Sequence, residues 1–278
     1  MPTVHRSADA SVARRAAGAF LESRPARHNL VLTLLRERIR DPEAGRYWWV
    51  SWDGEVVGFA MQSPLTFHAA VLPTDPQAFE VLVDALWSDA PGLPGVIGEA
   101  DVAAHFAGGW TERAGIGARP DEGQRLYALG EPDPPSGVAG RLAAASVEDL
   151  ALLRRWVAGF HADTAMPPLG DAGGWLPGYL ADGGLWVWRH DGRPVAMART
   201  TPPVAGTSRV GFVYTPPEHR RHGYAAAIVA AISERLRSEG VQRCVLYTQL
   251  ENPTSNGVYR RIGYRAVAEI LRYDFGPS

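Results

Sequence analysis

Two stretches of this 278-residue sequence each have a counterpart in the other half of the chain, in the same order. Residues 48–61, WWVSWDGEVVGFAM, and residues 186–199, WVWRHDGRPVAMAR, both read as a strand, an Asp-Gly turn and a second strand, as in a β-hairpin. Residues 94–115 and 243–264 both run from an apolar strand through a polar turn into a short helix and a new strand. A tandem duplication explains both matches, so the sequence predicts two related halves.

The boundary between the halves is predicted at residues 130–137, GEPDPPSG. This stretch is polar, is rich in proline and glycine, and lies between segments of regular apolar spacing. The chain length suits two domains of about 100–200 residues each. We therefore expect a first domain over residues 1–133 and a second over residues 134–278.

Composition and charge exclude several classes of protein. The net charge of −2 gives no basic field for nucleic acid or an anionic membrane, and no apolar run reaches the length of about 18 residues that would span one. Cys244 is the single cysteine, so an internal disulfide and a cysteine metal cluster are excluded, and we expect an inert buried thiol and no metal site. The first 20 residues lack the apolar segment of a signal peptide, and a soluble cytoplasmic protein is the default expectation.

The second half alternates predicted strands and helices, which indicates a mixed α/β domain. Ser146 and Asp149 form a plausible capping box for the first helix, and Gly240 is a natural C-cap for the longest one. Residues 167–174 are rich in proline and glycine, and we expect the tract 161–175 to be an irregular loop that shapes an acceptor site. The predicted strands cover residues 138–144, 185–189, 194–201, 209–214, 243–249 and 265–275, and the predicted helices cover residues 147–161, 224–239 and 254–262.

The segment PEHRRHGYAAAIVAAI, residues 217–232, places cationic side chains and one glycine directly before an apolar helix. The first N–H groups of a helix have no internal partner and carry partial positive charge, so an anion such as phosphate fits there. Gly223 lets the backbone approach that anion closely, and Arg220 and Arg221 can add charge-assisted hydrogen bonds. The segment therefore predicts a diphosphate-binding loop. The alternative is a solvated basic turn.

Two motifs in this half resemble those of the GCN5-related N-acetyltransferase (GNAT) superfamily. Motif A, with the signature Arg/Gln-x-x-Gly-x-Gly/Ala, matches Arg220, Gly223 and Ala225. Motif B, an asparagine, a tyrosine seven residues later and a glycine-aromatic pair, matches Asn252, Tyr259, Gly263 and Tyr264. The resemblance covers about residues 138–278, and this region also resembles the FR47-like branch, which includes glycine N-acyltransferase-type enzymes. It implies an α/β fold of tandem GNAT-like domains, each with a mixed, mostly antiparallel sheet flanked by helices.

The resemblance also implies acetyl-CoA, or another acyl-CoA, as the donor. It implies that the strand before the loop pairs its backbone with the pantetheine arm, through Val213, Tyr214 and Thr215. It implies that N–H groups after Arg220 hold the pyrophosphate, namely those of Arg221, His222, Gly223, Tyr224 and Ala225. Asn252 and Asn256 would hydrogen-bond the pantetheine or the turn that frames it, although both asparagines also suit simple turn and cap positions.

Tyr259 is implied as the catalytic acid. Attack of a neutral amine on a thioester forms an oxyanion and expels a thiolate, which a phenol can protonate. The alternative is that Tyr259 is a core aromatic at helical spacing from Ile262. The general base is left open among five candidates, with a water chain to backbone groups as the alternative: Glu218, Glu251, His161, Asp163 and Tyr214.

The first half lacks a comparable loop. Its corresponding segment, FHAAVLPTDPQAFEVLVDAL at residues 67–86, has no glycine before the helix and no arginine pair, and Asp75 stands where an anion needs positive charge. The first domain is therefore expected to be a degenerate GNAT-like domain without a cofactor loop. We predict one CoA per chain, bound by the second half.

Two functions remain open on the sequence alone. One is an acyl-CoA-dependent N-acyltransferase that acts on a primary amine of a small molecule, amino acid or peptide. The other is a non-catalytic CoA-binding module for sensing or assembly. The acceptor, the acyl length and the oligomeric state, of which a homodimer is one option, are not determined by the sequence.

Overall fold

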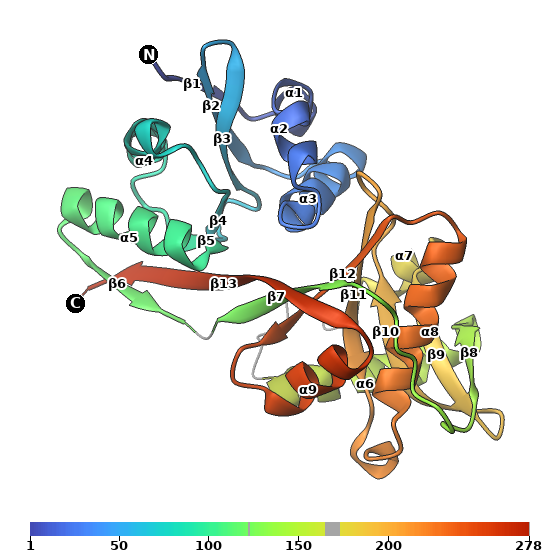
Figure 1. Ribbon diagram of the computed structural model, residues 1–278. Helices are drawn as coiled ribbons and strands as arrows, with labels where there is room; N and C mark the ends of the chain where they lie inside the picture. Colours follow the sequence, from blue (N-terminus) through green and yellow to red (C-terminus); the bar gives the residue numbers. More distant parts are fainter. Residues whose placement is uncertain (122, 165–172, 278) are drawn as a thin grey trace. The chain divides into compact units, whose positions relative to one another are not determined.

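The computed structural model describes residues 1–121, 123–164 and 173–277, and the chain divides into two compact units (Figure 1). Unit 1 comprises Met1–Leu126, Thr248–Asn252 and Val267–Ser278, and unit 2 comprises Tyr127–Tyr247 and Pro253–Ala266. The unit boundary at residues 126/127 lies close to the predicted one at 133/134. The division differs from the predicted domains in the two C-terminal segments that belong to unit 1.

Unit 1 contains a sheet in the order β1-β2-β3-β4-β5-β13, with β6 paired to β13. Among the described residues of this unit, the strand pairings are antiparallel except that of β4 with β5. The predicted hairpin is confirmed as β2 and β3, whose turn residues Asp53 and Gly54 both have positive φ, at 48° and 85°. The elements before β7 are β1 (Thr3–Ser7), α1 (Ala10–Ala16), α2 (Gly18–Ser23), α3 (Asn29–Arg40), β2 (Arg46–Trp52), β3 (Glu55–Gln62), β4 (Ala69–Val71), α4 (Pro76–Asp89), β5 (Gly95–Glu99), α5 (Ala100–Ala114) and β6 (Gly117–Pro120).

Unit 2 contains strands in the order β12-β11-β10-β9-β8, with β7 (Gln124–Leu129) next to β12. The pairings from β8 to β12 are antiparallel except that of β11 with β12. Both units therefore have the predicted mixed, mostly antiparallel sheet flanked by helices. The remaining elements are β8 (Arg141–Ala144), a 3₁₀ turn (Val147–Asp149), α6 (Leu150–Thr164), α7 (Leu176–Ala181), β9 (Leu185–His190), β10 (Arg193–Thr200), β11 (Thr207–Tyr214), a 3₁₀ turn (Pro217–His219), α8 (Tyr224–Ser238), β12 (Arg243–Gln249), α9 (Pro253–Arg261) and β13 (Tyr264–Gly276).

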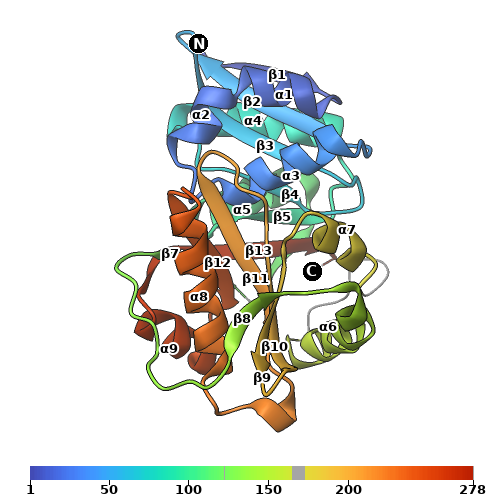
Figure 2. The ribbon, with the colours of Figure 1, turned by 90° about the vertical axis from the view of Figure 1, so that its right-hand side faces the viewer.

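The strands of unit 2 carry helices on both faces (Figure 2). Along β9 and β10, alternate side chains pack to opposite sides, as a strand period of two requires. Trp186 and Ala198 join the core against α8, whereas Val187 and Met197 join the core against α6 and α7. These two faces decide which helices surround each residue of the site.

Strand β13 begins in unit 2 and ends in unit 1. Its second part pairs with β5 from Ile270↔Glu99 to Asp274↔Gly95, and with β6 from Tyr273↔Pro120 to Gly276↔Gly117. Phe275 stacks on the fully buried Trp110 with ring centroids 5.2 Å apart. The last strand of the chain thus completes the sheet and core of unit 1. A division by sequence position alone could not reveal this.

The capping box predicted at Ser146 and Asp149 is confirmed, with the Ser146 N–H 2.8 Å from Asp149 Oδ2. The expectation of an irregular loop over residues 161–175 is wrong at its start, because α6 continues to Thr164. Its middle part lies outside the described residues. Strand β8 is also shorter than predicted, since it begins only at Arg141, after Gly140 with φ of 114°.

Cys244 is buried on β12 and unpaired, as expected for an inert thiol. Burial raises the pKa of Cys244 to about 11, so the sulfur remains a thiol at neutral pH. Over the described parts of the chain, no helix combines the length and apolar character needed to cross a bilayer.

Candidate functional site

The hydrogen-bonded ladder between β11 and β12 ends before either strand does. Parallel pairs run from Thr207↔Arg243 to Val210↔Leu246, while β11 continues to Tyr214 and β12 to Gln249. Within the described residues, the edge of β11 that faces β12 is unpaired from Gly211 onward. An extended ligand can pair with such an edge through main-chain hydrogen bonds.

Strand β11 has a bulge at the start of this unpaired stretch. The register with β10 shifts between Arg199↔Gly211 and Met197↔Tyr214, so β11 has one extra residue there. Phe212 within the bulge has φ of 49°, an uncommon conformation for a residue with a large side chain. Bulges bend a strand and redirect its side chains, and strained residues of this kind gather at functional sites.

The loop between β11 and α8 presents a row of main-chain donors. Arg221 and Gly223 have φ of 66° and 81°, and the first helical hydrogen bond runs from Ala227 N to Gly223 O at 3.0 Å. Among the described residues, the N–H groups of residues 221–226 donate to no backbone acceptor. Residues 220–223 are exposed. Successive free amides in such turns, at the positive end of a helix dipole, form an anion-binding concavity.

Gly223 is required by both conformation and space. Its φ of 81° is unfavourable for a residue with a Cβ atom, and a Cβ there would lie 3.0 Å from Val138 Cγ2. The sequence predicted a glycine for close backbone approach to an anion. The structure adds the segment before β8 as its second constraint.

The side chain of Arg220 has two partners within the fold. Its Nε donates to Thr215 O at 3.0 Å, and its guanidinium forms an ion pair with Asp163 of α6. The role of Arg220 in phosphate binding therefore stays a prediction, and a phosphate would compete with the acid that tertiary folding brings to this guanidinium. Among the described residues, Arg221 forms no ion pair, so its exposed guanidinium remains available to an anion.

The hydroxyl of Tyr214 is packed against α6 at Gly159, where a Cβ would lie 2.3 Å from it. Burial raises the pKa of Tyr214, and the nearby charge of Asp163 raises it further. A phenol held neutral in this way is a poor general base, which counts against Tyr214 as the catalytic base. Its backbone remains on the unpaired edge of β11.

Tyr259 lies on α9 in the core of unit 2, with 8% of its surface exposed. Its ring centroid is 6.4 Å from that of Tyr127 and 6.2 Å from that of Tyr264. Burial raises the pKa of Tyr259 to about 12. Both readings from the sequence fit this environment, since the phenol is a core aromatic and is also kept protonated.

The two asparagines expected to bind the pantetheine arm, Asn252 and Asn256, lie in different units. Asn256 on α9 is 3% exposed, and its Oδ1 accepts a 2.8 Å hydrogen bond from the hydroxyl of Tyr127. This oxygen holds β7 against α9, a structural role that sequence reasoning missed. Asn252 belongs to a segment of unit 1, and its N–H donates to Gln249 O at 3.2 Å, which closes the turn after β12.

The candidates for a general base are dispersed. Glu218 and Glu251 are exposed, and Asp163 is paired with Arg220. His161, in the last turn of α6, packs edge-on against the ring of Phe212 with centroids 5.8 Å apart. His161 is therefore the candidate that contacts the bulge of β11.

A hollow of about 420 Å³ lies near the start of α8, lined by residues 139–141 and 189–192. One of its residues, His190, has Nδ1 2.7 Å from the hydroxyl of Tyr224, the first residue of α8. The ring of Tyr224 also stacks on His222, with centroids 5.5 Å apart. The loop and this hollow are thus connected through Tyr224.

Unit 1 has no equivalent of the loop in the residues that the structure describes. Between β4 and α4, Leu72 N donates to Phe59 O and Asp75 N donates to Val57 O, both at 3.0 Å. Pro73 and Pro76 carry no N–H at all. The amide N–H groups that would face an anion are therefore largely hydrogen-bonded to the backbone or absent at proline.

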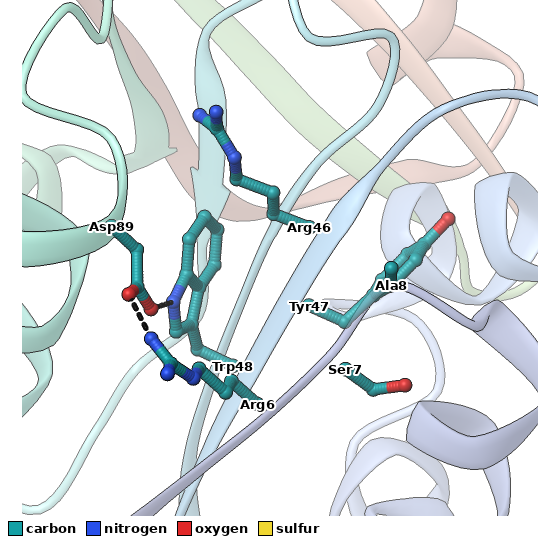
Figure 3. A pocket seen from close by; sticks show the side chains of 7 residues that line it. All are labelled: Arg6, Ser7, Ala8, Arg46, Tyr47, Trp48 and Asp89. Carbon is teal, nitrogen blue, oxygen red and sulfur yellow. Dashed lines mark hydrogen bonds and ion pairs between the residues drawn. The ribbon is translucent and has the colours of Figure 1, made fainter.

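A pocket of about 400 Å³ in unit 1 lies elsewhere, between β1, β2 and the end of α4 (Figure 3). Asp89 accepts a 2.8 Å hydrogen bond from Trp48 Nε1 and pairs with Arg6 (Figure 3). Arg46, on the far side of the indole, donates to Gln62 Oε1 at 3.2 Å. The polar groups of this pocket are occupied by one another, so it does not offer a second donor loop.

Comparison with known proteins agrees with this geometry. Residues 153–264 match the sequence model described as the acetyltransferase (GNAT) family. An acetyltransferase from the GNAT family of Colwellia psychrerythraea is similar in structure, with a TM-score of 0.65 and 12% identity over 99% of this chain and 100% of that one. A GCN5-related N-acetyltransferase from Sphaerobacter thermophilus is similar with a TM-score of 0.61 and 19% identity, over 98% of this chain and 94% of that one.

A tandem GNAT protein from the clavulanic acid biosynthesis pathway gives a TM-score of 0.58 and 13% identity, over 100% of both chains. The comparison with curated protein sequences gives no significant match. The solved structures show that the two-unit fold is shared along the whole chain, and the family match covers the unit with the donor loop. Residues 153–264 therefore match the acetyltransferase (GNAT) family, and the whole chain shares its fold with a tandem GNAT protein.

Proposed function

We propose that the protein is an acyl-CoA-dependent N-acyltransferase that transfers acetyl from acetyl-CoA to a primary amine of a small molecule, amino acid or peptide. The observation that carries this proposal is the row of free N–H groups at residues 221–226, next to the unpaired edge of β11. The N–H groups suit a diphosphate, and the unpaired strand edge suits the extended, amide-containing pantetheine arm.

In this proposal the amides of residues 221–225 bind the pyrophosphate, and Arg221 adds charge. The backbone of residues 213–215 pairs with the pantetheine arm, which leads the thioester toward the bulge at Phe212. His161, which contacts that bulge, is the preferred group to take a proton from the acceptor ammonium. Holding both substrates in register supplies the larger part of the acceleration.

Tyr259 is proposed to donate a hydrogen bond or proton to the departing thiolate. With a pKa of about 12 the phenol is protonated at any physiological pH. Full proton transfer from such a weak acid to a thiolate with a pKa of ~8.5 is uphill, so we expect stabilisation mainly by hydrogen bonding.

A non-catalytic CoA-binding module is the second candidate. It is favoured by one observation, the ion pair of Asp163 on α6 with Arg220. This pair occupies one of the carboxylates that could act as the general base. Release of thiol from acetyl-CoA with a panel of amines separates the two functions. Tight acetyl-CoA binding without release for any amine would support the module and reject the transferase.

Calorimetric titration with acetyl-CoA is expected to give one site per chain, because the described loop amides between β4 and α4 of unit 1 are largely bonded or replaced by proline. The Gly223→Ala variant tests whether the single site lies in unit 2, because this substitution should strongly weaken the binding measured in the titration. Two equivalent sites in the wild type would contradict the proposed division of roles.

Replacing Tyr259 with phenylalanine is expected to lower kcat by about 100-fold, the usual scale for loss of a positioned proton donor, with the Kd for acetyl-CoA nearly unchanged. Because the pKa of Tyr259 is raised to about 12, the rate should show no decline from its ionisation below about pH 11. Tyr264→Phe is the matched control. It loses a buried 2.7 Å hydrogen bond to Ser233, so it should cost about 1–3 kcal/mol of stability with kcat retained. Equal kcat in both variants would remove Tyr259 from the chemistry.

A further inference from the structure

The ion pair of Arg220 with Asp163 connects the loop before α8 to the last turn of α6. These two helices pack on opposite faces of the strands of unit 2 (Figure 2). The two side chains are 43% and 44% exposed. Because water screens an ion pair of this kind, it contributes little to stability. Either partner can therefore be taken over by a stronger one at small cost.

Each charge of this pair lies at the helix end that disfavours it. The C-terminal end of α6 carries partial negative charge, and Asp163 adds a carboxylate there. The start of α8 carries partial positive charge and free N–H groups, and Arg220 adds a cation beside them. The pair neutralises both charges within the protein. An anion bound before α8 and a cation bound after α6 would stabilise the same two helix ends.

A diphosphate in the loop is a stronger partner for Arg220 than Asp163 is. It would also meet the free N–H groups of residues 221–226 and the exposed Arg221. Hydrogen bonds from a guanidinium to phosphate oxygens are among the strongest in proteins. Arg220 Nε donates to Thr215 O at 3.0 Å, which keeps the side chain at the loop while its outer nitrogen atoms change partner.

Asp163 lies beside the strand edge assigned to the pantetheine arm. Burial raises the pKa of Tyr214, and the charge of Asp163 raises it further, which shows that this carboxylate lies near the phenol. The backbone of Tyr214 lies on the unpaired edge of β11. A primary amine with a pKa of ~10 is an ammonium at neutral pH, and a carboxylate at the negative end of a helix attracts it.

We propose that the diphosphate of the donor replaces Asp163 as the partner of Arg220, and that the released Asp163 carboxylate binds the ammonium of the acceptor. This inference rests on the proposed acyl transfer. Because Arg220 occupies the carboxylate until the donor arrives, the donor binds first. Each substrate then strengthens the binding of the other, since linkage between two sites is reciprocal.

The binding test is calorimetric titration of acetyl-CoA into Asp163→Asn. The Kd should fall about 2–5-fold, the scale of one exposed ion pair, because Arg220 no longer has to leave a partner. Glu239→Gln is the matched control. It removes a carboxylate that is 49% exposed and 2.9 Å from Arg235 Nε, at the far end of α8, and it should leave the Kd unchanged. Unchanged or weaker binding in Asp163→Asn that is folded by circular dichroism would overturn the exchange.

A second background separates the exchange from a simple change of charge. Arg220→Gln should weaken acetyl-CoA binding about 10-fold, the scale of one charge-assisted hydrogen bond. In that background Asp163→Asn should have no further effect, because no pair is left to break. Equal tightening by Asp163→Asn with and without Arg220 would show only the loss of a negative charge near the loop, and would overturn the exchange.

Turnover tests the acceptor role and separates it from the proposed function. Thiol release from acetyl-CoA is measured with a panel of amines. In Asp163→Asn the KM for the amine should rise about 10-fold while the Kd for acetyl-CoA falls, and a merely destabilised protein does not shift its two substrates in opposite directions. An unchanged KM would overturn the acceptor role and keep the transferase. Acetyl-CoA binding without release for any amine would reject the transferase and the acceptor role, and the titrations would still decide the exchange.

Discussion

Replacing Gly223 with alanine is expected to weaken acetyl-CoA binding by about 100-fold and to leave unit 2 folded. The residue has φ of 81°, and the added Cβ would lie 3.0 Å from Val138 Cγ2. The loop relieves this conflict by rotating its peptide groups, which misaligns the free N–H donors of residues 221–226. Losing two hydrogen bonds to a charged group, at ~1.5 kcal/mol each, amounts to about 3 kcal/mol, or roughly 100-fold in Kd. Isothermal titration calorimetry measures the change.

Gly240→Ala is the matched control for backbone strain. Gly240 follows the other end of α8 with φ of 88°, and a Cβ there would have no atom within 4 Å. Alanine in this conformation costs about 1–2 kcal/mol at either glycine. The control should therefore lower stability to a similar degree and leave the Kd for acetyl-CoA unchanged. If both variants bind equally well, the N–H groups before α8 are not the diphosphate site.

Ending the chain at Glu269 is expected to unfold unit 1. The deletion removes the pairs that residues 270–276 of β13 form with β5 and β6, and it removes the stack of Phe275 on Trp110. The lost side chains that pack on unit 1 include Tyr273 and Phe275. At ~1.5–3 kcal/mol for each large apolar side chain, plus the unpaired strand edge, the loss approaches the 5–15 kcal/mol that stabilises an ordinary domain. Hydrogen exchange should show that the amides of β5 and its neighbours lose their protection.

Two further variants accompany that measurement, one with a smaller expected loss of stability and one with no expected loss. Phe275→Ala removes one ring from a core that stays paired, so it should destabilise unit 1 by about 2–3 kcal/mol in urea unfolding. A chain that ends at Gly276 loses no residue of β13 and should behave as the full chain. Full exchange protection of unit 1 in the chain that ends at Glu269 would show that β13 is dispensable for this unit.

Several local features were predictable because each depends on residues close together in the chain. The Asp-Gly turn of the β2–β3 hairpin, the Ser146–Asp149 capping box and the glycine before α8 are all confirmed. Such signals arise from backbone sterics and short-range hydrogen bonds, which a few neighbouring residues determine. The order of elements in unit 2 followed from the same rules.

Residue partners across the fold were not predictable in this way. Arg220 is held by Asp163, 57 positions away in the sequence, and Asn256 Oδ1 accepts from Tyr127 across 129 positions. No local pattern distinguishes these polar side chains from free ones. Their availability to a ligand depends on which distant residue the fold brings within hydrogen-bond distance.

By itself, the sequence determined that the chain has two related α/β halves and that only the second has a donor loop before a helix. Only the tertiary structure decided that β13 completes unit 1, that Arg220 forms an ion pair with Asp163, and that three aromatic rings surround Arg199. The physical reason is the range of the interactions. Turns, caps and helix starts are encoded by adjacent residues, whereas strand partners, ion pairs and ring contacts form between segments that meet only when the chain has folded.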